Sequence, residues 1–218
     1  DDQVIVVTNV FKKYSFYQEA LDLFLLVEKK SETNKTYPIQ KAQLYQLLSD
    51  DEMMINEYLK YLEKNPTQKI TILNYLQRYL DNNGIENENN FNYVKNGLFR
   101  FSQKEKETYV FSELLIWLFM QNNEFNLAFL QAKALDKRLK EDGYRIYDLA
   151  ETFLDNNYYD LAIKSYQYII DKGPTNYYYI DAHVNLLFAL GSKEYIDLDK
   201  LDALYSNTIK KLGENNNT

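Results

Sequence analysis

The stretch Tyr144–Pro174 reads YRIYDLAETFLDNNYYDLAIKSYQYIIDKGP, and it aligns without a gap on VFSELLIWLFMQNNEFNLAFLQAKALDKRLK, Val110–Lys140, which lies 34 residues earlier. Both copies place apolar residues at matching positions and a pair of asparagines, Asn122-Asn123 and Asn156-Asn157, in the middle. Self-similarity at a fixed period is typical of a repeat array, because one unit is too small to bury its own apolar face and stacks on its neighbours. The sequence therefore predicts a repeat protein.

The amino-acid composition limits which fold classes and which partners are compatible with the chain. The chain has 218 residues, of which 45% are hydrophobic, so it can bury a core. Six Gly and three Pro are too few for the many tight turns of an all-β protein, which favours helices. A net charge of -7 opposes binding to a phosphate backbone, so we expect no nucleic-acid partner. Cysteine is absent, which excludes disulfides and thiolate metal sites.

Apolar residues recur with helical spacing in segments that come in pairs. The first pair is Val4–Tyr14 and Tyr17–Lys30, interrupted at Ser15-Phe16. A second pair begins near Pro38 and turns at Ser49–Glu52, which has the pattern of a capping box. Short turns make such helices antiparallel neighbours. The predicted units are approximately 1–34, 35–68, 69–108 with a polar loop insertion at 81–90, 109–142, 143–176 and 177–212, followed by a disordered tail at 213–218.

One position in each second helix sets the register of the repeat. The spacing between successive members is 34, 40, 34 and 34 residues, and we place the extra residues of the longer interval in the Asn-rich loop 81–90. Loops of this kind can lengthen without disturbing the stack. The members are Ala20, Met54, Val94, Ala128 and Ala162.

These positions resemble the tetratricopeptide repeat of bacterial repeat proteins over nearly the whole chain. The resemblance implies an all-α fold, a right-handed α-solenoid of about six antiparallel helix pairs within a single repeat domain, 1–212. Departures are the missing Trp at the first conserved position and Lys41, where Leu is usual; they imply less regular packing there. The residues that match the family in the first and fifth units are Val4, Val7, Phe11, Tyr17, Ala20, Phe24, Ile146, Leu149, Ala150, Phe153, Tyr159, Ala162, Tyr166 and Pro174.

Motifs for catalysis are missing from the sequence. His183 is the only histidine, and we expect it to pack in the core of the sixth unit. The carboxylates show no metal-ligand spacing, and neither the phosphate-binding glycine motifs nor G-x-S-x-G occurs. We therefore expect no enzyme, no cofactor and no metal.

The resemblance implies binding of another protein or peptide on the concave surface lined by the first helices. Acidic and aromatic residues on that surface would suit a basic or aromatic partner, although a solvated acidic face is the alternative. For Trp117 both core packing and a binding platform stay open, because its helix is apolar all round. The positions at which related proteins grip a terminal carboxylate hold only one matching residue, Asn9. The predicted site residues are Glu113, Trp117, Tyr147, Glu151, Asp155 and Asp181.

Two further functions remain open at this stage: a structural spacer or arm of a longer protein, and a helical enzyme with a concave-face site. No apolar run is long enough for a membrane span. The chain opens on Asp1, which fits either a trimmed chain in the cytoplasm or an exported, periplasmic protein that has lost its signal peptide. Partner identity and oligomeric state are not encoded in any motif of the sequence.

Overall fold

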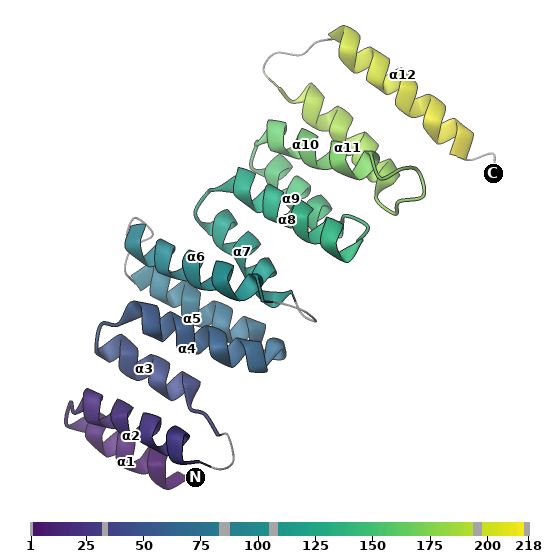
Figure 1. Cartoon of the computed structure of the whole chain (residues 1–218). Helices are drawn as coiled ribbons and strands as arrows, with labels where there is room; N and C mark the ends of the chain where they lie inside the picture. Colours follow the sequence, from purple (N-terminus) through teal and green to yellow (C-terminus); the bar gives the residue numbers. More distant parts are fainter. Residues whose placement is uncertain (1, 32–34, 83–87, 105–108, 194–197, 216–218) are drawn as a thin grey trace. The chain divides into compact units, whose positions relative to one another are not determined.

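The computed structural model describes residues 2–31, 35–82, 88–104, 109–193 and 198–215. The chain divides into two compact units, Asp1–Leu115 and Ile116–Thr218, and each is described by itself. Within each unit, consecutive helices lie side by side (Figure 1).

The fold is all-α, as predicted, and no strand occurs in the described ranges. In the first unit α1 packs on α2 and α3 on α4, and in the second unit α10 packs on both α9 and α11. Helix α7 spans the boundary between the units. The helices are α1 (Asp2–Lys13), α2 (Tyr17–Lys30), α3 (Pro38–Leu47), α4 (Asp51–Lys64), the 3-10 helix η1 (Pro66–Gln68), α5 (Lys69–Asn82), α6 (Glu88–Ser102), α7 (Val110–Gln121), α8 (Phe125–Leu139), α9 (Tyr144–Asp155), α10 (Tyr159–Ile170), α11 (Tyr179–Gly191) and α12 (Leu198–Asn215).

The same backbone turn joins the two helices of four pairs. At each turn one residue has a positive φ, between 56° and 65°, and the next residue donates its N–H to the carbonyl five positions earlier. This is the bonding pattern of a Schellman motif, which satisfies carbonyls at a helix end. The predicted repeat is thus also visible in the backbone. The bonds are Phe16 to Phe11 (2.9 Å), Asp50 to Tyr45 (2.9 Å), Glu124 to Phe119 (2.8 Å) and Tyr158 to Phe153 (2.7 Å).

The start of α4 differs from the predicted capping box. Ser49 has a φ of 58° and belongs to the left-handed turn, so it cannot serve as the N-cap. Asp50 is the N-cap instead, and its Oδ1 accepts a hydrogen bond from the backbone N–H of Met53 at 3.1 Å. Pro38 occupies the first turn of α3, as predicted.

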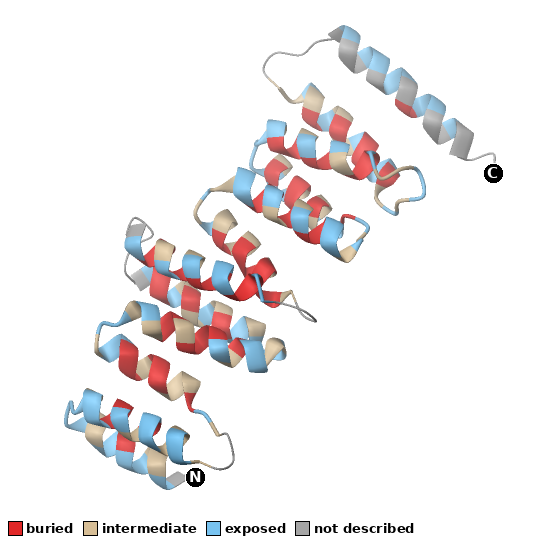
Figure 2. Ribbon diagram, in the orientation of Figure 1, coloured by how far each residue is buried: buried red, intermediate tan, exposed pale blue. Residues whose placement is uncertain are grey.

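The register position of the second helices is buried in all five repeat units for which it was assigned. Ala20, Val94, Ala128 and Ala162 are 0% exposed and Met54 is 1% exposed. Figure 2 shows buried residues as stripes along the helices, with exposed residues on the opposite faces. This confirms that the repeated position is a packing position, at which side-chain volume is restricted.

Both ends of the predicted loop 81–90 are helical. Helix α5 continues to Asn82 and α6 begins at Glu88, while residues 83–87 lie outside the described ranges. Asn90 is buried, and its Oδ1 accepts a hydrogen bond from the hydroxyl of Tyr79 at 2.9 Å. Similarly, α12 extends to Asn215, so the described part of the predicted tail 213–218 is helical. The unit boundaries and the single domain 1–212 stay predictions.

Lys41 forms a buried ionic cluster with two glutamates. It is 5% exposed, and its Nζ lies 2.8 Å from Oε2 of Glu28 and 3.0 Å from Oε2 of Glu57. Burial alone would lower the pKa of Lys41, but the hydrogen bonds and charges of both glutamates outweigh it and raise that pKa. A charged residue thus occupies a buried position of α3, where it pairs with α2 and α4.

His183 is buried, as predicted for the core of the sixth repeat, which belongs to the second compact unit. It is 5% exposed, its ring contacts that of Tyr179 edge to face at 4.7 Å, and its Nδ1 lies 3.3 Å from Oγ1 of Thr208. Within the described ranges, no helix has the length and apolar character that crossing a membrane requires.

Candidate functional site

The predicted site residues do not all lie in one unit. Glu113 belongs to the first unit, where it is partly buried and forms an ion pair with Lys69 of α5 at 2.6 Å. Trp117 is half-buried on the part of α7 that belongs to the second unit. This intermediate exposure leaves both interpretations of Trp117 open. The other four residues lie on α9 and α11 of the second unit.

Tyr147 and Glu151 of α9 meet Asn185 of α11 in one hydrogen-bonded cluster. The Nδ2 of Asn185 donates to Oε1 of Glu151 at 2.9 Å and to the hydroxyl of Tyr147 at 3.2 Å. The hydroxyl of Tyr166 in α10, whose side chain is 0% exposed, also donates to Oε1 of Glu151. The ring of Tyr147 stacks on that of Tyr178 at 4.7 Å between centroids. We call these five residues the α9–α11 cluster.

The cluster has a negative electrostatic environment. Burial raises the pKa of Tyr147, and the negative charges of Glu151 and Asp181 raise it further. Burial also raises the pKa of Tyr166, as does its hydrogen bond to Glu151. Both hydroxyls therefore stay protonated at neutral pH and serve as hydrogen-bond donors to carboxylates or as neutral acceptors.

One of the two carboxylate oxygens of Glu151 is available to accept a further hydrogen bond. Its Oε1 accepts both hydrogen bonds, and among the described residues its Oε2 has no hydrogen-bond partner. Asp155 lies one turn after Glu151 on α9, and Asp181 lies one turn before Asn185 on α11; both are exposed. The structure thus joins Tyr147 and Glu151 through Asn185 and places Asp155 and Asp181 on the same two helices.

Three members of the cluster were not among the predicted site residues. Asn185 follows Glu151 by 34 residues, so the repeat period alone could have identified it as the equivalent position on the next first helix. Tyr178 precedes α11, and Tyr166 comes from a second helix. No periodicity on the first helices could have found these two tyrosines, because their contacts depend on how α10 packs against its neighbours.

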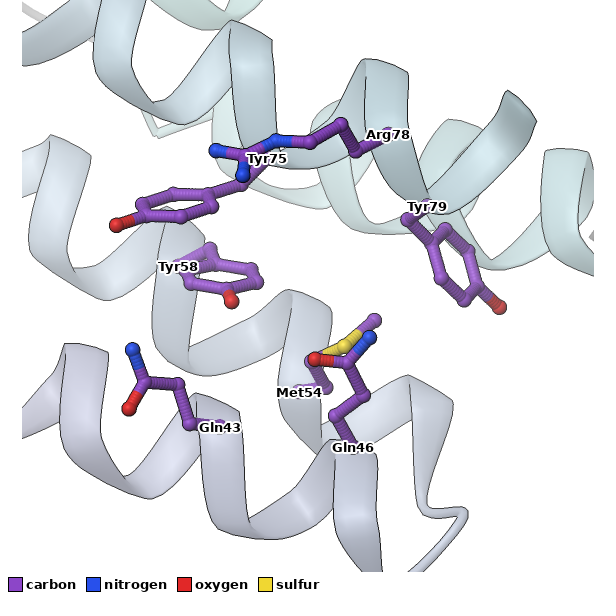
Figure 3. Close-up of a pocket in the computed structure, with 7 residues that line it drawn as sticks. All are labelled: Gln43, Gln46, Met54, Tyr58, Tyr75, Arg78 and Tyr79. Carbon is purple, nitrogen blue, oxygen red and sulfur yellow. The ribbon is translucent and has the colours of Figure 1, made fainter. Parts of the chain in front are cut away.

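A second feature lies in the first unit, between α3, α4 and α5. It is a pocket with a volume of about 250 Å³, shown in Figure 3. The rings of Tyr58 and Tyr75 stack at 4.9 Å with an interplanar angle of 9°, and Cζ of Arg78 lies 5.1 Å from the centroid of Tyr75. Its lining residues are Gln43, Gln46, Met54, Tyr58, Tyr75, Arg78 and Tyr79.

Within the ranges that the structure describes, no group of three His, Asp or Glu side chains is placed so that it could hold a metal ion. The arrangement of both features suits non-covalent binding through hydrogen bonds, aromatic faces and charge.

Comparisons with known proteins add little. No family model and no curated protein matches the chain. Among solved structures, a tetratricopeptide repeat protein from Parabacteroides merdae ATCC 43184 is similar at 14% sequence identity and a TM-score of 0.34, covering 94% of this chain and 83% of that one. A likeness this distant carries no argument about function, and the all-α fold stands on the helices described above.

Proposed function

We propose that this protein is a non-catalytic interaction module that binds a basic or aromatic peptide segment of a partner protein on the surface formed by α9 and α11. The observation that carries the proposal is the α9–α11 cluster, in which Asn185 holds Tyr147 and Glu151 in a fixed arrangement. Side chains held in place before binding lose less conformational entropy when a ligand arrives.

The chemistry of this surface favours a cation. The Oε2 of Glu151 can accept a hydrogen bond from a Lys or Arg side chain, while the stacked rings of Tyr147 and Tyr178 provide aromatic faces for cation–π contact. Exposed Asp155 and Asp181 extend the negative potential along the two helices. Complementary charge speeds encounter and selects against acidic partners.

The direct test is selection from a random peptide library displayed on phage, with the wild-type protein immobilised. We expect enriched peptides to carry Lys or Arg together with aromatic residues. The same peptides should bind poorly to the Asp155→Lys, Asp181→Lys variant and normally to Asp171→Lys, which changes an exposed acidic residue at the end of α10. Failure to enrich any Lys- or Arg-containing peptide, or enrichment of such peptides that bind both variants equally, would exclude the proposed surface.

Glu151 is unsuitable for this test, although it is central to the cluster. It accepts a hydrogen bond from buried Tyr166, so Glu151→Lys would leave that hydroxyl without its acceptor and disturb the packing of α9 on α10. Substitutions at exposed Asp155 and Asp181 change the charge of the surface without removing a hydrogen bond of the cluster.

A further inference from the structure

The lining of the pocket between α3, α4 and α5 is positively charged, although the whole chain has a negative net charge. Arg78 is the only charged residue among those that line it, whereas the protein carries a net charge of -7. The Nε of Arg78 donates to the backbone carbonyl of Asn74 at 3.2 Å, which fixes the side chain. Its two terminal nitrogens have no hydrogen-bond or ion-pair partner among the described residues.

A stack of aromatic rings supports the guanidinium of Arg78. Tyr75 lies between Tyr58 and Arg78, as Figure 3 shows, so the cation is positioned by the ring rather than by a carboxylate. Tyr58 is 4% exposed and Met54 is 1% exposed, and together they give the pocket an apolar floor.

Lys12 adds a second positive charge beside the pocket, because it is hydrogen-bonded to the lining residue Gln43. The Oε1 of Gln43 accepts a hydrogen bond from Nζ of Lys12 in α1 at 3.5 Å. The amide nitrogen of Gln43 lies on the side of Tyr58 in Figure 3, where it can donate to a ligand. The pocket thus combines an apolar floor with donors and positive charge at its edge.

We propose that this pocket binds a partner peptide that inserts an aromatic side chain and pairs the carboxylate of an adjacent acidic residue with Arg78. The aromatic ring would contact Met54 and Tyr58, because thioethers and aromatic rings attract one another. The terminal nitrogens of the guanidinium present two donors in a fork that matches a carboxylate. This site lies in the first unit and does not depend on the α9–α11 surface, from which it differs in the charge of its ligand.

The size of the pocket favours an inserted side chain over a free cofactor. Its volume of about 250 Å³ is below the range of about 300 to 1,000 Å³ that is usual for small-molecule sites. A peptide residue needs less space, since the rest of its chain lies outside the pocket and contacts the exposed residues Gln46 and Arg78.

The test titrates the amidated dipeptide N-acetyl-Phe-Glu-amide into isotopically labelled protein at millimolar concentration and follows the NMR signals of Arg78 Nε–H and of the tyrosine rings. We expect saturable shifts at Arg78 and Tyr75. N-acetyl-Phe-Gln-amide, which lacks the charge, should bind about ten-fold more weakly, as expected for the loss of a charge-assisted pair.

Two variants and one further probe complete the experiment. Arg78→Gln should weaken N-acetyl-Phe-Glu-amide binding about ten-fold, whereas Arg100→Gln should not, although Arg100 is also an exposed arginine beside an aromatic ring in the same unit. The proposal is overturned if the dipeptide causes no shifts at Arg78 and Tyr75, or if Arg78→Gln binds as wild type. It is also overturned if 3-phenylpropionate binds more tightly than the dipeptide, because the site would then be one for free acids.

Discussion

The ammonium nitrogen of Lys41 in α3 lies 2.8 Å from Oε2 of Glu28 in α2, and Lys41 is almost fully buried. Glu57 of α4, which is 2% exposed, forms an ion pair with the same ammonium group at 3.0 Å. Removing the cation would leave Glu28 without its ion-pair partner and Glu57 with only the partly exposed Lys60, while both carboxylates have little access to water. Lys41→Met should therefore lower the free energy of unfolding by about 3 to 5 kcal/mol, measured by urea denaturation.

The control for this prediction removes the opposite charges as well. Lys41→Met combined with Glu28→Gln and Glu57→Gln should recover much of the lost stability, since no uncompensated charge then stays buried. Lys60→Met should have a small effect, because the side chain of Lys60 is 46% exposed although it also pairs with Glu57. A Lys41→Met protein as stable as wild type would show that the cluster is not desolvated.

Ala162 tests the register of the repeat. It is 0% exposed at the packing position of α10, so a larger side chain has no space there. Ala162→Leu should lower the free energy of unfolding by about 1 to 3 kcal/mol through overpacking. Ala134→Leu in α8 makes the same change at an exposed position and should leave thermal unfolding near that of wild type. Equal melting temperatures for Ala162→Leu and wild type would contradict the assigned register.

The helix pairs and their buried register followed from the sequence because they depend on local spacing. The 34-residue period placed Ala128 and Ala162 correctly, and both are buried. The polar run at 81–90 indicated a loop, yet Asn90 is buried in α6 because Tyr79 offers it a hydrogen bond. Composition could not predict that partner, since it is supplied by the neighbouring helix.

The candidate site was predictable only in part, for a related reason. Tyr147 and Glu151 were identified from the face of α9 that they share, and they do meet through Asn185. Glu113 forms an ion pair with Lys69 of α5. The sequence of α7 alone could not predict this partner. The stack of Tyr58 and Tyr75 joins α4 to α5, so it emerges only once the helices are packed. Contacts between units of the repeat depend on three-dimensional packing that one period cannot specify.

The raised pKa of Tyr58 predicts how the free energy of unfolding changes at alkaline pH. Burial raises its pKa to about 12, the charge of a neighbouring Tyr75 acts in the same direction, and the Arg78 charge opposes both. An unfolded tyrosine loses its proton near pH 10, whereas folded Tyr58 keeps it until about pH 12. The stability contributed by the folded, protonated form is therefore complete below pH 10 and is lost as pH rises from 10 to 12.

Single substitutions distinguish the contribution of Tyr58 to this pH dependence from that of the other tyrosines. The free energy of unfolding of wild type should fall above pH 10, and for Tyr58→Phe this fall should be smaller by up to about 3 kcal/mol. Tyr177→Phe, at a residue that is 81% exposed, should retain the wild-type slope. Circular dichroism with urea at several pH values measures both. Identical slopes for the two variants would exclude the assigned role of Tyr58.

The claim that the α9–α11 surface binds a basic partner by charge is tested most directly by salt-dependent affinity. The measurement is the dissociation constant of a selected Lys- or Arg-containing peptide, at low and at physiological salt, for wild type and for Asp155→Lys, Asp181→Lys. Salt screens charges to about 8 Å at physiological ionic strength, so wild-type binding should weaken as salt rises. The variant should bind about ten-fold more weakly at low salt and depend less on salt. Equal affinities of wild type and variant at low salt would contradict the account and place the partner elsewhere on the protein.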